Sequence, residues 1–388
     1  MKAAPARVAS SLRNWLLNEV CPFWFDRLLD PAGGFYEGLD AASQAVRSTE
    51  RTILNQARLT YVASHAWLMG KDPRMLRAAE HGFAFVKNAC ALDGQQGGWP
   101  RKLCVDGTVV DGACDAYDHA FIIFAMAWHY RATGNSQAVT LADQAYGFMQ
   151  TKLADALHGG FFEEYPLIKK LPRRQNPHMH LLEAVLAMHA ATGDGKWMSR
   201  AQQLVMLCEK HFFDSGSGSL AEYFKADWSA EEGEAGALRE PGHQFEWVWL
   251  LGEYAKQSGD GRMTALAGHL FTFGEKFGVD RHDALGGAVM DGLNPQGSVV
   301  ASTKLFWPQT EYIKACVAKF EMSGEQKYLS AGIAHVALLR RHFFRADGAN
   351  WCNQLSRNGE MMVDVTPSRV LYHLFLGIAE IMRVHEHA

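Results

Sequence analysis

Histidines and carboxylates at helical spacing are the residues of this chain best suited to acid–base chemistry. In PGHQFEW, His243 and Glu246 are three positions apart, which places both side chains on one face of a helix. A carboxylate beside an imidazole can hold the ring and adjust its pKa toward the range used in proton transfer. We therefore expect His243 to act as a general acid or base with Glu246 as its partner. A purely structural histidine–glutamate pair is the alternative interpretation.

The segment NPHMHLLEA adds two more histidines, His178 and His180. Positions two apart on a helix point away from each other, so these rings do not readily share a metal ion. The HExxH pattern of zinc enzymes is also missing from the sequence. We therefore predict no metal site. One of the two histidines is expected to face a pocket and the other the surface or a loop.

These residues belong to a repeat that is marked by a tight glycine turn between two helical segments. Glycine adopts the left-handed conformation at a helix end more readily than other residues. The turns recur every 59 to 66 residues, at Gly70, Gly134, Gly193, Gly259 and Gly324. A Gly-rich turn, such as GGFYE or GGFFEEY, recurs out of phase with them. A period of this length predicts a repeat architecture.

The two helical segments of each repeat differ in polarity. The first is apolar nearly all round, as in DHAFIIFAMAWHYRATG, which is typical of a buried helix. The second carries more charge, as in GKWMSRAQQLVMLCEK, and fits an outer layer. The N-terminal segment VASSLRNWLLNEVCPFWF supplies the outer partner of the last inner helix. The pattern predicts an all-α fold, an (α/α)6 barrel of six inner and six outer helices.

Closure of the barrel is favoured because an open solenoid needs polar capping repeats, and neither end of this chain has them. We predict that residues 1–388 form a single catalytic domain. The Gly-rich turns and long loops are expected at one rim, and the tight turns at the other.

Counting back from each tight-turn glycine places polar residues at equivalent depths of the inner helices. Twelve or thirteen positions before the glycine stand Arg58, Phe121, His180, Glu246 and Glu311. Sixteen or seventeen positions before it stand Tyr117, Asp118, Asn176, His243 and Trp307. Buried polar groups are costly unless they pair or face a polar cavity. We therefore expect one pocket at the long-loop mouth, with His180 rather than His178 facing it.

Composition narrows the possible partners and location. The formal net charge of −4 does not indicate nucleic-acid binding. The sequence has no run of about 18 uncharged apolar residues, so we expect no membrane span. Charged residues interrupt the apolar stretch at the N-terminus, so this stretch does not resemble a signal peptide. Seven cysteines without a CxxC pair indicate reduced thiols and a cytoplasmic location. We expect a small-molecule substrate, no cofactor, and a monomer or homodimer.

Six segments resemble the N-acylglucosamine 2-epimerase superfamily, in order and spacing, over nearly the whole chain: QARL, YDHAF, NPHMHLLEA, PGHQFEWVWLL, WPQTEYIKA and YHLF. The resemblance implies an (α/α)6 barrel and a 2-epimerase or aldose–ketose isomerase activity. It also implies that His243 and His373 are the catalytic pair. Sugar-binding or supporting roles are implied for Arg58, Tyr117, Asn176, His180, Glu246 and Trp307. The depth count adds Glu311 to this set.

Two segments bear on the substrate. NPHMHLLEA is more similar to bacterial mannose isomerases than to animal N-acylglucosamine epimerases. TPSRVLYH lacks the tryptophan that cellobiose 2-epimerases carry shortly before the last histidine. Both favour a compact monosaccharide site and mannose as substrate, with N-acylglucosamine or another sugar 2-epimerisation as the alternative.

The chemistry of an open-chain sugar then predicts a metal-independent reaction through a cis-enediol. A base removes the C2 proton; return of a proton to C1 gives the ketose, and return to C2 from the other face gives the 2-epimer. We assign the C2–C1 transfer to His373. We assign ring opening and proton transfer on the opposite face of the enediol to His243. Arg58 is expected to stabilise the enediolate oxygen.

Two further interpretations stay open. A glycoside hydrolase needs two carboxylates across one bond, and Glu246, Glu311 and Asp118 are available. A non-catalytic sugar-binding protein is the other alternative, although a full set of histidines argues against it.

Overall fold

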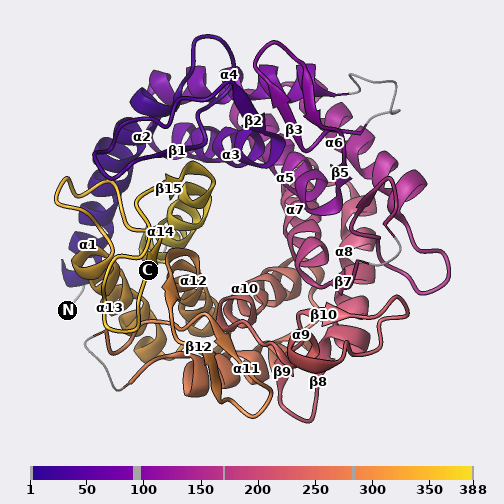
Figure 1. Cartoon of the computed structure of the whole chain (residues 1–388). Coiled ribbons are helices and arrows are strands. Elements are labelled where there is room, and N and C mark those ends of the chain that lie inside the picture. Colours follow the sequence, from indigo (N-terminus) through magenta and orange to yellow (C-terminus); the bar gives the residue numbers. More distant parts are fainter. Residues whose placement is uncertain (1–2, 91–97, 169–170, 282–284, 387–388) are drawn as a thin grey trace.

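The computed structural model describes residues 3–90, 98–168, 171–281 and 285–386. Within these ranges, six helices form an inner ring around the barrel axis (Figure 1). They are α3 (Ile53–Gly70), α5 (Ala116–Thr133), α7 (Asn176–Thr192), α10 (Pro241–Ser258), α12 (Phe306–Ser323) and α14 (Leu371–Glu386). Neighbouring inner helices touch all the way round, including α14 against α3, so the barrel is closed.

The outer layer of the described residues surrounds this ring (Figure 1). It consists of α1 (Ala3–Asn14) with its continuation through η1 (Trp15–Val20) and α2 (Cys21–Leu28), then α4 (Pro73–Ala89), α6 (Ser136–Phe148), α8 (Gly195–Leu207), α11 (Met263–Phe273) and α13 (Gln326–His342). Three outer helices end in π-helical turns, η2 (Met149–Leu153), η3 (Cys208–Phe212) and η4 (Gly274–Gly278). The predicted (α/α)6 barrel is confirmed.

The N-terminal segment completes the outer layer beside the last repeat, as predicted. Helix α1 packs against α14. The indole of Trp15 donates a hydrogen bond of 3.0 Å to the carbonyl oxygen of Gly348, and that of Trp24 one of 2.9 Å to Ala349. These bonds tie the two ends of the chain together.

Four of the five tight turns have the predicted glycine cap. Left-handed φ angles of 73°, 69°, 76° and 72° occur at Gly134, Gly193, Gly259 and Gly324. The first turn differs, because α3 includes Gly70 and the left-handed residue is Lys71, with φ 55°. Counted from Lys71, Arg58 stands thirteen positions before its cap, the same depth as its four equivalents.

A second ring of polar residues, fifteen positions before each cap, holds the loops. We call these residues the loop latches: Gln56, His119, His178, Gln244 and Gln309. Each accepts a hydrogen bond of 2.6 to 3.2 Å from a buried backbone N–H that follows a Gly-rich turn. Burial lowers the pKa of His119 to about 4 and that of His178 to about 3, which keeps both rings neutral.

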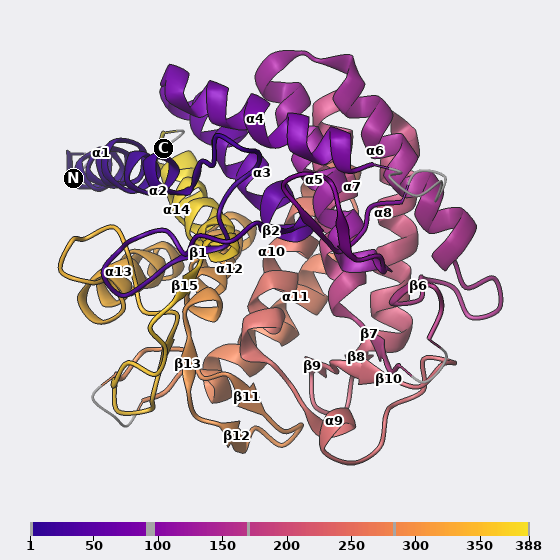
Figure 2. The same cartoon turned by 45° about the horizontal axis from the view of Figure 1, so that its top comes forward.

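Short strands and long loops lie at the end of the barrel where the inner helices begin (Figure 2). The strands are β1 (Gly38–Leu39), β2 (Glu50–Thr52), β3 (Lys102–Cys104), β4 (Val109–Asp111), β5 (Cys114–Asp115), β6 (Glu164–Tyr165), β7 (Arg173–Arg174), β8 (Phe213–Asp214), β9 (Ser219–Leu220), β10 (Tyr223–Phe224), β11 (Gly292–Leu293), β12 (Val299–Ala301), β13 (Lys304–Leu305), β14 (Gln354–Leu355) and β15 (Thr366–Pro367). All pairings are antiparallel, and β1 pairs with β15 across the closure of the ring.

Two short helices, α9 (Gly233–Ala237) and η5 (Ser368–Val370), also lie in the loops.

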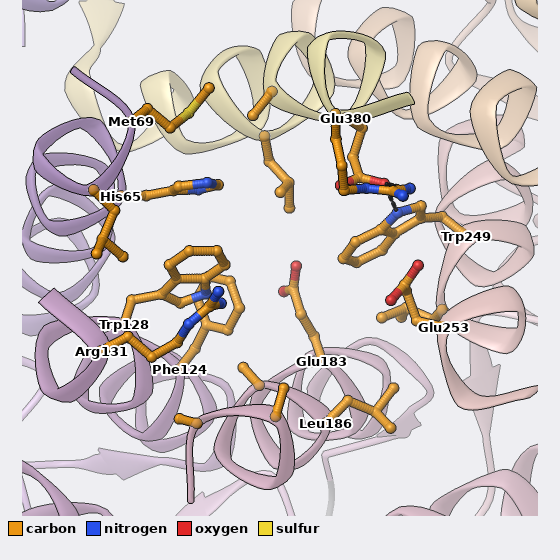
Figure 3. Close-up of a pocket in the computed structure, with 18 of the residues that line it drawn as sticks. His65, Met69, Phe124, Trp128, Arg131, Glu183, Leu186, Trp249, Glu253 and Glu380 are labelled. Carbon is orange, nitrogen blue, oxygen red and sulfur yellow. Dashed lines mark hydrogen bonds and ion pairs between the residues drawn. The ribbon is translucent and has the colours of Figure 1, made fainter. Parts of the chain in front are cut away.

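At the opposite end of the barrel, where the tight turns lie, the inner helices surround a cavity of about 760 Å³ (Figure 3). No described helix combines the length and apolar character that a membrane crossing requires.

Candidate active site

Arg58 lies in the barrel interior on α3 and is 3% exposed. Its Nη2 donates a 2.6 Å hydrogen bond to the Tyr117 hydroxyl, and its Nη1 donates one of 3.4 Å to the carbonyl oxygen of Arg369. The guanidinium also lies 4.0 Å from the centre of the Phe121 ring. Its hydrogen bonds within the described chain therefore go to neutral groups. A buried cation with neutral partners is costly, and it is suited to an anion that forms during a reaction.

His373 on α14 is held by a carboxylate in the orientation of a general base. Its Nδ1 lies 2.7 Å from Oε1 of Glu311, whose other oxygen is 2.6 Å from Nζ of Lys314. Burial lowers the pKa of His373 well below its usual value, and the cations Arg58 and Lys314 lower it further. With Nδ1–H donated to Glu311, the ring is neutral and Nε2 carries the lone pair.

His243 on α10 has the opposite electrostatic environment. Its Nδ1 lies 2.8 Å from Oε2 of Glu222 and 3.4 Å from Oε2 of Glu240. Burial alone would lower the pKa of His243, but these two carboxylates together raise it to about 10. The ring is thus an imidazolium at neutral pH and is suited to donate a proton.

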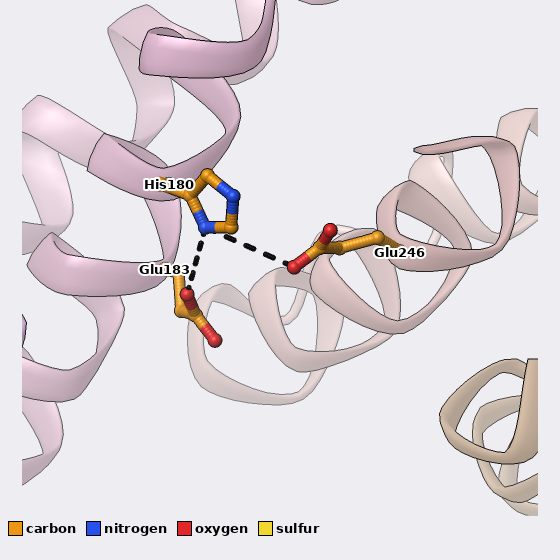
Figure 4. A group of neighbouring side chains, drawn as sticks. All are labelled: His180, Glu183 and Glu246. Atoms are coloured by element: carbon orange, nitrogen blue, oxygen red, sulfur yellow. Dashed lines mark hydrogen bonds and ion pairs between the residues drawn. The ribbon is translucent and has the colours of Figure 1, made fainter. Parts of the chain in front are cut away.

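The expected pairing of His243 with Glu246 is wrong. The two residues share a helix face, but Glu222, in the loop after β9, holds the imidazole. Glu246 adds only a weaker electrostatic contribution to the raised pKa of His243. Its Oε1 instead lies 3.8 Å from Nδ1 of His180 (Figure 4). The same oxygen lies 3.6 Å from Nζ of Lys314.

His180 faces the same interior, as predicted, and its Nδ1 lies 3.1 Å from Oε2 of Glu183 (Figure 4). The Tyr372 hydroxyl contacts both oxygens of that carboxylate, at 2.5 and 2.6 Å. Burial lowers the pKa of His180 to about 3, although Glu246 opposes the shift. A neutral His180 is suited to hydrogen bonding with a sugar hydroxyl rather than to proton donation.

Trp307 lies beside both proposed catalytic histidines. Its ring centre is 4.9 Å from that of His243 and 5.7 Å from that of His373. The ring fits because position 242 is glycine: a Cβ at Gly242 would lie 2.5 Å from the indole. Trp307 is half-buried, so part of the ring remains open to a ligand.

Two rim residues complete the predicted set. Tyr117 lies in the first turn of α5, is half-buried, and its ring centre is 4.9 Å from that of His180. Asn176 is the first residue of α7, and its Oδ1 is buried without a hydrogen-bond partner in the described chain. The structure therefore brings the predicted residues to one end of the barrel, and Asn176 offers an unused acceptor there.

Four residues of the site were missed from the sequence. Glu183 and Lys314 stand ten positions before their caps, one helical turn deeper than the ring of Arg58, so the same count would have found them. Tyr372 and Glu222 had no such signal. The last helix has no tight turn after it, and Glu222 belongs to an irregular loop.

The spacing of His178 and His180 and the missing HExxH pattern predicted no metal site, but the structure does bring other possible metal ligands together. Three groups of this site each bring possible ligand atoms within 4.8 Å of one another. They are His180 with Glu183 and Glu246, Glu222 with Glu240 and His243, and Glu246 with Glu311 and His373. These groups are nevertheless poorly suited to bind a metal ion, because positive charge already lies at two of them. The second group contains the His243 imidazolium, and the Lys314 ammonium lies beside the third.

We accordingly expect activity to survive metal removal. Exhaustive treatment with EDTA, followed by assay in metal-free buffer, should leave kcat unchanged because Arg58, Lys314 and the His243 imidazolium already supply positive charge. A loss of activity that Mg²⁺, Mn²⁺ or Zn²⁺ restores would contradict this expectation.

The opposite pKa shifts predict a broad pH optimum. The rate should fall in acid only well below pH 6.5, when His373 gains a proton. It should fall in alkali near pH 10, when His243 loses its proton. Glu222→Gln should move the alkaline limb down by about 1 to 3 pH units, since an opposite charge at this distance shifts a pKa by that amount. Profiles of kcat/KM for both proteins measure this, and an unmoved acid limb is the internal control.

The fold and the site together define a class of protein. One histidine with a lowered pKa and one with a raised pKa lie beside a single tryptophan near a buried guanidinium, an arrangement suited to acid–base chemistry. A model of the N-acylglucosamine 2-epimerase family matches residues 33–377. The chain belongs to this family of sugar isomerases and epimerases.

Relatives with curated names agree with this class. The chain is similar to a mannose-6-phosphate isomerase of Rhizobium meliloti (strain 1021), at 31% identity over 96% of each protein. It is similar to a cellobiose 2-epimerase of Ruminococcus albus, at 22% identity over 89% of this chain and 90% of that protein. A solved D-mannose isomerase shares the fold with a TM-score of 0.87, at 22% identity over 96% of this chain and 98% of that one.

Proposed function

We propose that this enzyme converts mannose to fructose through a cis-enediol. The observation that carries this proposal is a pair of histidines beside Trp307 whose pKa values are shifted in opposite directions. The mannose isomerase names among its relatives and the missing tryptophan before His373 support a monosaccharide substrate.

Ring opening is the first step of the proposed reaction. The His243 imidazolium donates a proton to the ring oxygen, the bond between C1 and the ring oxygen breaks, and the C1 hydroxyl gives its proton to water as the C1 carbonyl forms. Glu222 and Glu240 hold the positive ring in place before this step and strengthen its affinity for the proton. The Trp307 ring supports the apolar face of the sugar.

Proton transfer at carbon is the second step. Nε2 of His373 takes the proton from C2, negative charge develops on O1, and the Arg58 guanidinium stabilises it. The O2 proton passes to O1 within the cis-enediolate, and His373 then returns its proton to C1 as the C2 carbonyl forms. The overall change moves one hydrogen from C2 to C1 and one from O2 to O1, so no cofactor or redox partner is required.

A single NMR experiment tests this function. Mannose incubated with the enzyme in deuterated buffer should yield fructose that carries deuterium at C1, because the proton on His373 exchanges with solvent in some turnovers. Glucose should be a minor product. If the enzyme leaves mannose unchanged and inverts N-acetylglucosamine or N-acetylmannosamine at C2, it is a 2-epimerase instead.

Two observations are reasons to test for epimerisation and for other sugar substrates in the same assay. His243 also lies beside Trp307, and we assign to it the return of a proton to C2 from the other face, which gives a 2-epimer. One relative is named a mannose-6-phosphate isomerase, and the exposed Arg369 lies at the rim beside Arg58. Mannose and mannose 6-phosphate should therefore be compared by kcat/KM.

The glycoside hydrolase alternative is less well supported. Glu311 is occupied by His373 and Lys314, and Glu246 lies between His180 and Lys314, so neither is a solvated carboxylate across a bond. Asp118 is buried, and burial raises its pKa well above the usual value. A hydrolase assay on mannosides is expected to show no release of reducing sugar.

We further propose that the whole chain acts as one catalytic domain, in the cytoplasm, as a monomer or homodimer without a nucleic-acid partner. The seven cysteines are all free, which is consistent with a reducing compartment.

A further inference from the structure

The cavity at the tight-turn end of the barrel is a second concave site. It is lined by residues of α3, α5, α7, α10 and α14, together with Arg13 of α1, and its volume of about 760 Å³ falls in the range of small-molecule pockets. Figure 3 shows the side chains that point into it.

A buried polar layer separates this cavity from the catalytic histidines. Glu183 projects into the cavity in Figure 3, and its oxygens are bound by Tyr372 and His180 on the active-site side. Lys314 and Glu311 continue the layer across the barrel. The lining does not include the described His180, His243 or His373, so the two sites are distinct.

Aromatic rings flank the cavity on two sides. Trp128 and Trp249 lie across from each other (Figure 3), and the His65 ring is stacked on Trp128 with 3.8 Å between centres. The Nε1 of Trp128 is buried without a hydrogen-bond partner in the described chain. The Trp249 Nε1, by contrast, donates a 2.9 Å hydrogen bond to Glu380.

The polar groups of the cavity carry balanced charge. The described lining has the guanidinium groups of Arg13, Arg131 and Arg383 and the carboxylates of Glu183, Glu253 and Glu380. Arg131 lies 4.1 Å from the centre of the Trp128 ring. Balanced charge favours a neutral ligand, while carboxylates and guanidinium groups bind neighbouring hydroxyls of a polyol in pairs.

We infer that the tight-turn cavity is a second carbohydrate-binding site, for a neutral mono- or disaccharide held between Trp128 and Trp249. Aromatic faces bind the C–H face of a sugar, and Arg131 and Glu253 bind its hydroxyls. This site is independent of the reaction proposed above.

Fluorine NMR of protein labelled with 5-fluorotryptophan tests the inference. The His373→Ala background stops turnover, and Trp128→Phe, Trp249→Phe and Trp307→Phe assign the three relevant resonances. Mannose, glucose, fructose and cellobiose are titrated separately. At least one sugar should shift the Trp128 and Trp249 resonances in a saturable manner, with a dissociation constant below about 100 mM.

Arg131→Gln is the control that separates the two sites. It should weaken the titration seen at Trp128 about tenfold, as loss of a charged hydrogen bond does, and leave the titration at Trp307 unchanged. The inference is overturned if no sugar moves Trp128 and Trp249, or if their shifts follow the Trp307 isotherm and ignore Arg131→Gln. Failure of the proposed reaction would be seen separately, as wild-type protein without turnover.

Discussion

Replacing His373 by alanine is expected to lower kcat for mannose isomerisation by roughly 10² or more, as loss of a general acid–base group does. The His373 ring is neutral, because burial and the nearby cations Arg58 and Lys314 lower its pKa. Glu311 fixes which nitrogen carries the lone pair. Fructose formation measured at saturating mannose gives kcat directly.

His269→Ala provides the matched control for that experiment. His269 is an exposed histidine on the outer helix α11, far from the inner face of the barrel, and its loss should leave kcat unchanged. The role of His373 would be refuted if its alanine variant kept more than about half of the wild-type kcat with an unchanged unfolding temperature.

Arg58→Gln is expected to lower kcat by about 10² to 10³, the usual loss when one group that stabilises an oxyanion is removed. The same variant should be no less stable than the wild type. Arg58 is buried with neutral partners, so its removal relieves a desolvation cost. Kinetics and thermal unfolding on one preparation measure both effects.

A second buried arginine gives the contrast. Arg51 of the loop strand β2 is fully buried and forms an ion pair with Asp30. Arg51→Gln should cost about 3 to 5 kcal/mol of unfolding free energy, because Asp30 is left without its partner. If Arg58→Gln destabilised the protein to the same extent and kept its kcat, Arg58 would be structural.

The depth of a residue in its inner helix could be predicted from the sequence, because each tight turn gives a reference point from which positions are counted. Arg58, His180, Glu246 and Glu311 share one distance from their caps, and the structure places them in one layer. The same counting separates His180 from His178, since positions two apart face opposite sides of a helix.

Side-chain partners could not be predicted in this way. Glu222 holds His243 from a loop whose path has no period, so helix spacing suggested the wrong carboxylate. The ionic layer of Lys314, Glu311 and Glu246 depends on three-dimensional contact between α10 and α12. The short strands of the loops have two or three residues each, too few to show an alternating pattern.

A closed ring has no terminal repeat. In an open solenoid the end repeats fray first, because each has only one neighbour, and stability builds up repeat by repeat. Here β1 pairs with β15 and α1 packs on α14, so every repeat is held on both sides. Releasing one repeat means breaking two interfaces at once. The ring should therefore unfold cooperatively, and the seam between the two chain ends should be protected from hydrogen exchange as strongly as any other interface.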